Sequence, residues 1–214
     1  LADEINRAPA KTQSALLEAM QEGQVTIEGQ THVLPKPFIC VATQNPVEQE
    51  GTYPLPEAQL DRFLMNLFMD YPTAEEEKRL LSELIVGRVG DKLDLSKVNP
   101  VMSPERLAQL QLITAHITVD DRVVQYALDI VRKSREFSGI DMGAGVRAGM
   151  ALLRAAKACA LMNNRDYTVP DDVRYVAKDV LRHRISLTAD FTIDGYQINQ
   201  VIEQLLSAIN APRS

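Results

Sequence analysis

The sequence has no tryptophan, only two cysteines and only three histidines among its 214 residues, and each scarcity argues against a class of site. Cys40 and Cys159 each lie inside an apolar stretch, which favours small buried thiols over a disulfide or a reactive centre. His32, His116 and His183 are scattered and lie near no cysteine pair, so a dedicated metal cage is not expected. This use of cysteine fits a reducing, cytoplasmic compartment.

Long apolar runs and an excess of positive charge are also missing. No stretch approaches the roughly 20 apolar residues of a membrane-spanning helix, and the start of the chain lacks the charged-then-apolar pattern of a signal sequence. Lysine and arginine number 23 against 29 acidic residues, which gives a net charge of -6. A surface built mainly to neutralise a nucleic-acid backbone is therefore not expected, although this balance still allows a local basic groove.

The remaining composition is that of a globular protein, with 45% apolar and 24% charged residues. The length allows one large domain or two small ones. The chain does not begin with methionine, and its first residues look like part of a strand. We therefore expect it to be a piece of a longer protein.

Residues 1–72 mix helix and strand patterns. A helix is predicted over 9–22, ended by Gly23, and a hairpin over 24–34 with its turn at Glu28-Gly29. The run PFICVATQNP predicts a strand buried on both faces that ends in polar residues, where open α/β sheets place their ligands. A proline-punctuated loop and a short helix follow, and LMNLFMDYP (64–72) predicts a further strand.

Residues 73–214 read as helical. Thr73 and Glu76 form a capping box for a helix through about Val86, followed by a connector over 87–102. Ser103-Pro104, Thr118-x-x-Asp121 and Pro170 supply further starts, and the predicted helices cover 103–116, 119–137, 144–163, 170–183 and 195–209. The sequence thus predicts an α/β part, residues 1–72, and an all-α part, residues 73–214.

Two polar groups at predicted strand ends could carry phosphate chemistry. Asp3 could hold a hydrated magnesium ion while Glu4 polarises a water for attack on a phosphate, although such acidic pairs also occur as plain helix-start charges. Asn45 could orient that water or the terminal phosphate without adding another buried charge. The alternative is that Asn45-Pro46 simply turns the chain.

Two arginines have competing interpretations. Arg62 stands beside Asp61, where it is either a locally paired charge or an arginine that a subunit edge presents to the phosphate of a neighbouring protomer. Arg147 follows Gly143 and Gly145 near a predicted helix start, where small residues permit close approach to another surface. It is otherwise a surface arginine, at a helix end that disfavours positive charge.

Taken together, these residues resemble the MoxR family of AAA+ ATPases. The stretch from LADEINRAP to LFMDYP, residues 1–72, is similar to that family's ATPase core from the second acidic motif onward. GAGVRAGMALLRAAKACALMNNRDYTVPDDVRYVAKDVLRHRI is similar to its helical lid domain. The resemblance implies a partial, P-loop NTPase-like α/β core that lacks its first strands, followed by the helical lid.

The resemblance also implies a role for each candidate residue. Asp3 and Glu4 would end the Walker B strand, with Asp3 serving magnesium and Glu4 the attacking water. Asn45 would be sensor 1, Arg62 an arginine finger acting in trans, and Arg147 sensor 2, which reaches bound ATP from the lid. The hairpin over 24–34 resembles an insertion that faces the pore or a client in related rings.

The sequence departs from the family pattern in two places. Where the family usually reads G-A-S-P-R-A, this chain has Gly143-Ala144-Gly145-Val146-Arg147-Ala148, without the stiff Ser-Pro helix start. No G-x-x-x-x-G-K-[ST] phosphate-binding loop occurs in the 214 residues. We therefore expect the amino-terminal third of the domain to lie outside this chain, and these residues alone to bind ATP weakly and hydrolyse it negligibly.

For the parent protein the resemblance implies a homo-oligomeric, hexameric ring with ATP between subunits. Such a ring would use ATP and Mg²⁺ to remodel, assemble or activate client proteins, among them partners with von Willebrand factor type A domains. Two other interpretations stay open. One is a non-catalytic interaction module, which the missing phosphate-binding loop favours, and the other is a nucleic-acid motor, which the acidic balance disfavours.

Overall fold

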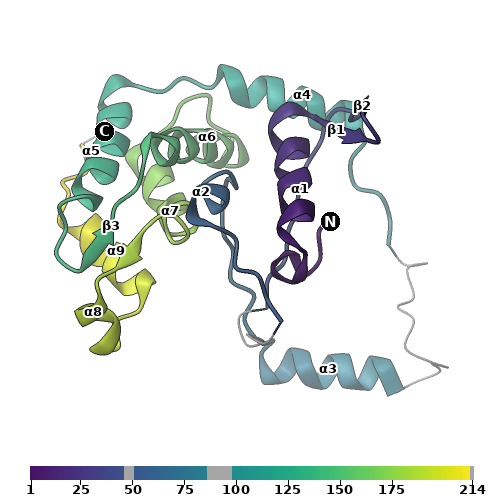
Figure 1. Ribbon diagram of the computed structural model, residues 1–214. Coiled ribbons are helices and arrows are strands. Elements are labelled where there is room, and N and C mark those ends of the chain that lie inside the picture. Colours follow the sequence, from purple (N-terminus) through teal and green to yellow (C-terminus); the bar gives the residue numbers. More distant parts are fainter. Residues whose placement is uncertain (46–50, 86–97, 213–214) are drawn as a thin grey trace. The chain divides into compact units, whose positions relative to one another are not determined.

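The computed structural model describes residues 1–45, 51–85 and 98–212 (Figure 1). They group into two compact units. The first unit consists of Leu1–Asn66 together with Pro104–Ser214, and the second is Leu67–Ser103. All five predicted site residues therefore belong to the first unit.

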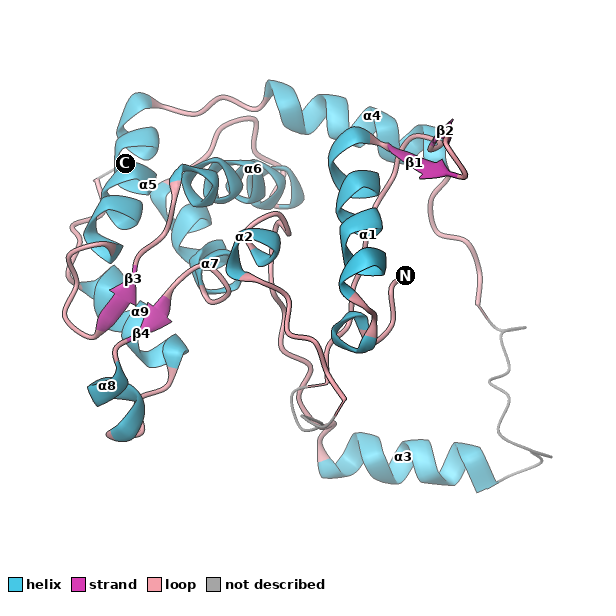
Figure 2. Ribbon diagram, viewed as in Figure 1, coloured by secondary structure: helices cyan, strands magenta, loops and turns pink. Residues whose placement is uncertain are grey.

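The first unit begins with a short 3₁₀ helix, η1 (Ile5–Arg7), and the helix α1 (Ala10–Glu22). Gly23 ends α1 in the left-handed conformation at φ 63°, which glycine adopts without steric cost. The strands β1 (Gln24–Ile27) and β2 (Gln30–Val33) then pair antiparallel, as the magenta arrows in Figure 2 show. Their two-residue turn has positive φ at both positions, the geometry that suits a twisted hairpin. The predicted helix and hairpin are confirmed.

The segment that follows the hairpin differs from its prediction. It does not form a strand buried on both faces. Among the described residues, its backbone pairs with another segment through an isolated parallel bridge between Ala42 and Ala2. Ile39 is 60% and Val41 54% exposed. The apolar run suits a central strand, but the described residues supply a neighbour on one edge and no covering layer. Cys40 is accordingly half-buried rather than buried.

The predicted strand over 64–72 is also wrong for this structure. These residues follow the short helix α2 (Glu57–Leu60) and are irregular. A strand needs a partner for its backbone groups. None of the described segments pairs with this one; the Asn66 N–H instead donates to the carbonyl of Asp179, 2.8 Å away, in the helical part.

The second unit contains α3 (Ala74–Ile85). Its predicted capping box is present, because the Thr73 N–H and hydroxyl both donate to the Glu76 carboxylate. These hydrogen bonds lower the pKa of Glu76. Val86 and residues 87–97 of the predicted connector lie outside the described residues.

The rest of the first unit is helical, and the five predicted helices are confirmed to within a few residues. They are α4 (Pro104–His116), α5 (Asp121–Ser134), α6 (Val146–Met162), α7 (Pro170–Leu181) and α9 (Ile198–Ser207). Asp120, rather than Thr118, caps α5 by accepting a hydrogen bond from the Arg122 N–H. The short α8 (Ala189–Ile193) and the two-stranded ribbon of β3 (Ile140–Met142) and β4 (Ser186–Leu187) were not predicted.

Helices α5, α6, α7 and α9 enclose the main hydrophobic core, with Leu152, Val180 and Leu205 fully buried. Small residues line the buried face of α6, among them Ala148 and Ala156, which let neighbouring helices approach closely. This core gives the carboxyl end of α7 and the start of α6 fixed positions. Across residues 1–45, 51–85 and 98–212, no helix combines the length and apolar character needed to cross a membrane.

Candidate nucleotide-hydrolysis site

The first residues of the chain run alongside the segment after the hairpin. The Ala2 N–H donates to the Val41 carbonyl at 2.8 Å, and the Thr43 N–H donates back to the Ala2 carbonyl at 3.0 Å. The Ile5 N–H continues the pairing to the Thr43 carbonyl at 3.0 Å. The ends of two parallel segments are thereby held at one edge, which is the arrangement expected for a ligand site.

Thr43 joins the predicted acidic pair to this edge. Its hydroxyl donates to Oδ1 of Asp3 and accepts from the Glu4 N–H, whose nitrogen lies 2.9 Å away. Asn45 lies two residues further along the same segment and is half-buried. The structure therefore brings Asp3 and Glu4 close to the tip that carries Asn45.

Glu4 has an unusual backbone conformation. Its φ is 48° and its ψ 51°, in the left-handed region that residues other than glycine seldom adopt. Its carboxylate forms an ion pair with Arg7, Nε to Oε2 at 3.2 Å, and both side chains are partly exposed. Here the conformation turns the chain immediately after Asp3.

Oxygen donors at this edge fit a magnesium ion. Mg²⁺ is commonly held by one or two carboxylates together with waters and the phosphates of a substrate. Asp3 offers such a carboxylate, and Oδ1 is already oriented by the Thr43 hydroxyl. Within the described ranges no group of three or more histidine, cysteine or acidic side chains forms a preassembled metal cage.

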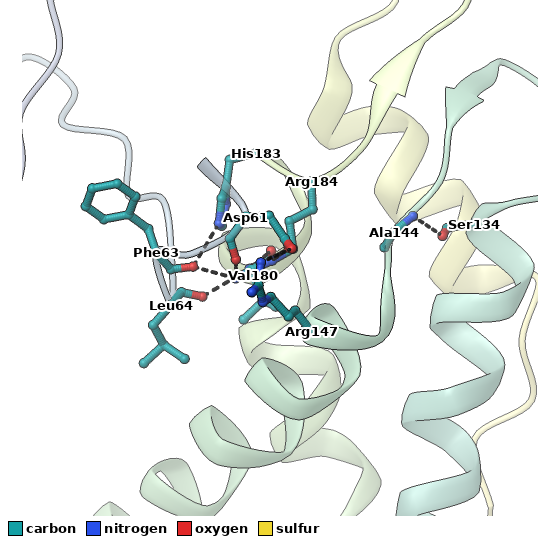
Figure 3. Close-up of polar contacts among 9 residues, drawn as sticks. All are labelled: Asp61, Phe63, Leu64, Ser134, Ala144, Arg147, Val180, His183 and Arg184. Carbon is teal, nitrogen blue, oxygen red and sulfur yellow. Dashed lines mark hydrogen bonds and ion pairs between the residues drawn. The ribbon is translucent and has the colours of Figure 1, made fainter. Parts of the chain in front are cut away.

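A second cluster surrounds Asp61, as Figure 3 shows. Arg184, 5% exposed, follows α7 and donates Nε to Asp61 Oδ1 at 2.9 Å. Its Nη atoms donate to the carbonyls of Asp61 at 3.1 Å, Leu64 at 3.1 Å, Phe63 and Val180. A buried guanidinium is tolerated when its donors are satisfied in this way. Burial lowers the pKa of Arg184, whereas its bonds to Asp61 act in the opposite direction.

Arg147 approaches the same carboxylate from α6. Its Nη1 lies 3.5 Å from Asp61 Oδ2, and its side chain is 51% exposed, so the pair is loose. The start of α6 is fixed from α5: the Ala144 N–H donates to the Ser134 hydroxyl at 2.9 Å, and Arg135 Nε donates to the Ala144 carbonyl at 2.9 Å. These contacts hold the helix start that carries Arg147 although the Ser-Pro pair of the family pattern is missing.

His183 completes this cluster. Its Nε2 donates to the Phe63 carbonyl at 3.2 Å, which leaves Nδ1 as the acceptor, and Nδ1 is buried without a hydrogen-bond partner among the described residues. Burial and the neighbouring Arg184 lower the pKa of His183 from 6.5 to about 4. The ring is therefore neutral at physiological pH.

This lowered pKa predicts an acid-sensitive stability. Because the unfolded chain binds the proton more tightly, the contribution of His183 is complete above about pH 6.5 and is lost as the pH falls toward 4. Solvent screening of the partly buried ring reduces the effect, so we expect a loss on the order of 1–2 kcal/mol between pH 7 and pH 4.5. Urea unfolding at both pH values should show a smaller difference for His183→Gln, and an equal difference would contradict the assignment.

Arg62 and Arg147 lie on one pocket of about 400 Å³, together with Arg154 and Arg184. Four arginines face two carboxylates there, Asp61 and Glu22, so the pocket favours anions. Nε of Arg62 is buried and has no hydrogen-bond partner among the described residues. The predicted residues thus form two groups: Asp3, Glu4 and Asn45 at one edge, and Arg62 with Arg147 at this pocket.

Sequence reasoning missed Asp61, His183 and Arg184. The sequence suggests Asp61 only as a local partner of Arg62, whereas its carboxylate pairs with Arg184 and Arg147. The run LRHRI offers a weak signal, since it places basic residues between apolar ones just after a helix. Nothing in the sequence indicates that the partner of Arg184 lies 123 residues away.

Two family profiles match the chain. Residues 1–65 match the ATPase family associated with various cellular activities (AAA), and residues 132–205 match the AAA lid domain. The chain is 43% identical over 222 aligned residues to the chaperone MoxR1 of Mycobacterium tuberculosis and 45% identical over 212 to the uncharacterized protein YeaC of Bacillus subtilis. The chain belongs to the MoxR family of AAA+ ATPases.

A solved structure supports the fold of this MoxR-family chain. The crystal structure of a protein from Cytophaga hutchinsonii, provisionally assigned as an ATPase, superposes with a TM-score of 0.88 at 41% identity. The match covers 99% of this chain and 66% of that one. The alignments cover 99% and 100% of the chain but 65% of YeaC and 57% of MoxR1. The fold is therefore a partial AAA+ α/β core followed by a helical lid, as the sequence predicted.

Proposed function

We propose that the complete protein hydrolyses ATP at the edge formed by Asp3, Glu4 and Asn45. The observation that carries the proposal is the Thr43 hydroxyl, which ties the Asp3 carboxylate and the Glu4 backbone to the segment leading to Asn45. In the proposal Asp3 binds magnesium, Glu4 withdraws a proton from the attacking water, and Asn45 orients that water through its amide. Magnesium, when bound, would draw negative charge from the phosphate oxygens.

The arginines take separate roles in this proposal. Arg147 reaches ATP bound by its own protomer, and Arg62 stabilises charge on ATP bound by a neighbour. The position of Arg62 on a pocket with an excess of arginine supports an anion partner from outside the chain. Because the two arginines share one pocket, that pocket would lie close to the junction between protomers.

The proposed assembly is a homo-oligomeric ring, a hexamer, that acts on client proteins. The name of the similar chaperone MoxR1 supports a chaperone-like role, in which hydrolysis drives remodelling or activation of protein complexes. Because the resemblance to the family implies partners with von Willebrand factor type A domains, the proposal includes such proteins among the clients. The domain division near residue 72 is likewise a proposal, with residues 73–214 forming a connecting helix and the helical lid.

Activity measurements require the complete gene product, because these 214 residues contain no G-x-x-x-x-G-K-[ST] motif. We expect the 214 residues alone to bind ATP weakly and to hydrolyse it negligibly. In the alternative proposal the 214 residues serve as a non-catalytic interaction module, and this missing motif is the observation that favours it.

Asp3→Asn in the complete gene product tests the magnesium role. The amide keeps the shape but loses the charge, so the magnesium concentration for half-maximal turnover should rise by about tenfold or more. Titrating magnesium at saturating ATP measures this, with Asp141→Asn, an exposed aspartate of β3, as the matched control. An unchanged magnesium requirement for Asp3→Asn, or an inactive complete gene product, would refute the proposed site.

A further inference from the structure

Arg184 has an unusual set of partners for a buried charge. Apart from the Asp61 carboxylate and the Val180 carbonyl of its own helical region, its guanidinium binds the backbone carbonyls of Asp61, Phe63 and Leu64. These residues surround Arg62 in the sequence. The side chain therefore holds the turn that carries Arg62, and it holds that turn mainly through backbone atoms (Figure 3).

Two further bonds attach the same turn to the same end of the lid, in and just after α7. His183 Nε2 donates to the Phe63 carbonyl, and the Asn66 N–H donates to the carbonyl of Asp179 in α7. The turn after α2 is thus bonded at Asp61, Phe63, Leu64 and Asn66 to one end of the lid. Arg62 lies within this bonded stretch, but its own Nε is left without a partner among the described residues.

We propose that Arg184 is a positioning residue: it joins the turn of residues 61–66 to the carboxyl end of α7, so that the lid and the arginine finger of one protomer move together. The inference rests on the proposed action of Arg62 in trans. Movement of a protomer's lid would then change how Arg62 meets the neighbour's ATP. An error of about 1 Å in such a group can lower the rate about 100-fold.

Arg184→Ala and Arg184→Lys in the complete gene product test the proposal. Arg184→Ala should lower kcat about 100-fold and leave KM for ATP within about twofold, and lysine, with donors on one nitrogen only, should give an intermediate rate. Arg174→Ala is the matched control, because Arg174 is a half-exposed arginine of α7 that pairs with Glu203. An Arg184→Ala or Arg184→Lys enzyme with the turnover of this control would overturn the proposal.

Mixed rings separate positioning from simple misfolding. A Glu4→Gln protomer should keep a working finger, and an Arg184→Ala protomer should keep a working hydrolytic edge, so mixing the two should restore turnover. A mixture of Arg62→Ala and Glu4→Gln protomers serves as the reference. If this reference restores turnover but the mixture of Arg184→Ala and Glu4→Gln protomers does not, the positioning role is wrong while the proposed function stands. If neither mixture does so, the trans role of Arg62 fails and this inference fails with it.

Amide hydrogen exchange gives a readout that does not depend on activity. Exchange in residues 62–66 should accelerate by about tenfold or more in Arg184→Ala and less in Arg184→Lys, while amides of the lid core, such as that of Leu152, keep their protection. Arg174→Ala should leave 62–66 unchanged. Unchanged exchange in 62–66 of either Arg184 variant would overturn the proposal, even if turnover falls.

Discussion

Replacing Arg62 with alanine is expected to lower ATP turnover of the complete gene product by about 10³-fold or more, while ATP still binds. A planar guanidinium can stabilise charge on two phosphate oxygens at once, and alanine leaves that charge unpaired. The structure supports this choice because Arg62 lines a pocket together with three further arginines, Arg147, Arg154 and Arg184. Turnover at saturating ATP and nucleotide affinity should be measured separately.

The effect of Arg62→Ala should cross the subunit boundary. In rings that mix Arg62→Ala with Glu4→Gln protomers, turnover should reappear, because the intact Arg62 of a Glu4→Gln protomer then meets the intact Glu4 of its neighbour. Arg79→Ala is a suitable control, since Arg79 is an exposed arginine of α3 paired with Glu83. No recovery of turnover in these mixed rings would show that Arg62 acts in cis.

Replacing Glu4 with glutamine is expected to lower turnover by about 10²–10⁴-fold without weakening ATP binding. Glutamine keeps the size of the side chain but cannot accept a proton from water. The left-handed backbone at Glu4 is retained in the variant, because the Glu4 N–H still donates to the Thr43 hydroxyl. Single-turnover hydrolysis and equilibrium binding of ATP should separate the two effects.

Glu136→Gln is the matched control for Glu4→Gln. Glu136 is an exposed glutamate after α5, so removing its charge should leave turnover within about twofold of wild type. A Glu4→Gln protein that hydrolyses ATP at the control rate would assign the base to another group. A protein that no longer binds ATP would instead give Glu4 a binding role.

Local patterns in the sequence predicted local structure well. The periodicity of α1 and of the lid helices, the Glu28-Gly29 turn and the Thr73–Glu76 capping box all depend on residues within about five positions of one another. The strand predictions at 37–45 and 64–72 failed because a strand depends on partners elsewhere. An apolar run indicates that burial of the segment is favourable. It does not indicate whether the described residues include a layer that covers the segment.

The candidate site likewise has a part that could be predicted from the sequence and a part that could not. Asp3, Glu4 and Asn45 could be predicted to meet because parallel segments end at a common edge, and the Ala2–Ala42 bridge makes that pairing visible. The contact between Asp61 and Arg184 could not be predicted, because it joins a turn to a helix end more than a hundred residues later. Long-range contacts of charged side chains follow from packing, which no local pattern encodes.

The way Arg184 binds its turn has a consequence for how freely that turn can vary. Most of its bonds end on carbonyl oxygens, which every amino acid possesses, so the side chains at positions 63 and 64 are not what the guanidinium recognises. Substitutions at Phe63 or Leu64 should therefore leave the attachment in place, provided that the chain keeps its path. Mutational tolerance in this region should therefore be low at positions 61 and 184 and high at positions 63 and 64. Side-chain size alone would suggest the opposite profile.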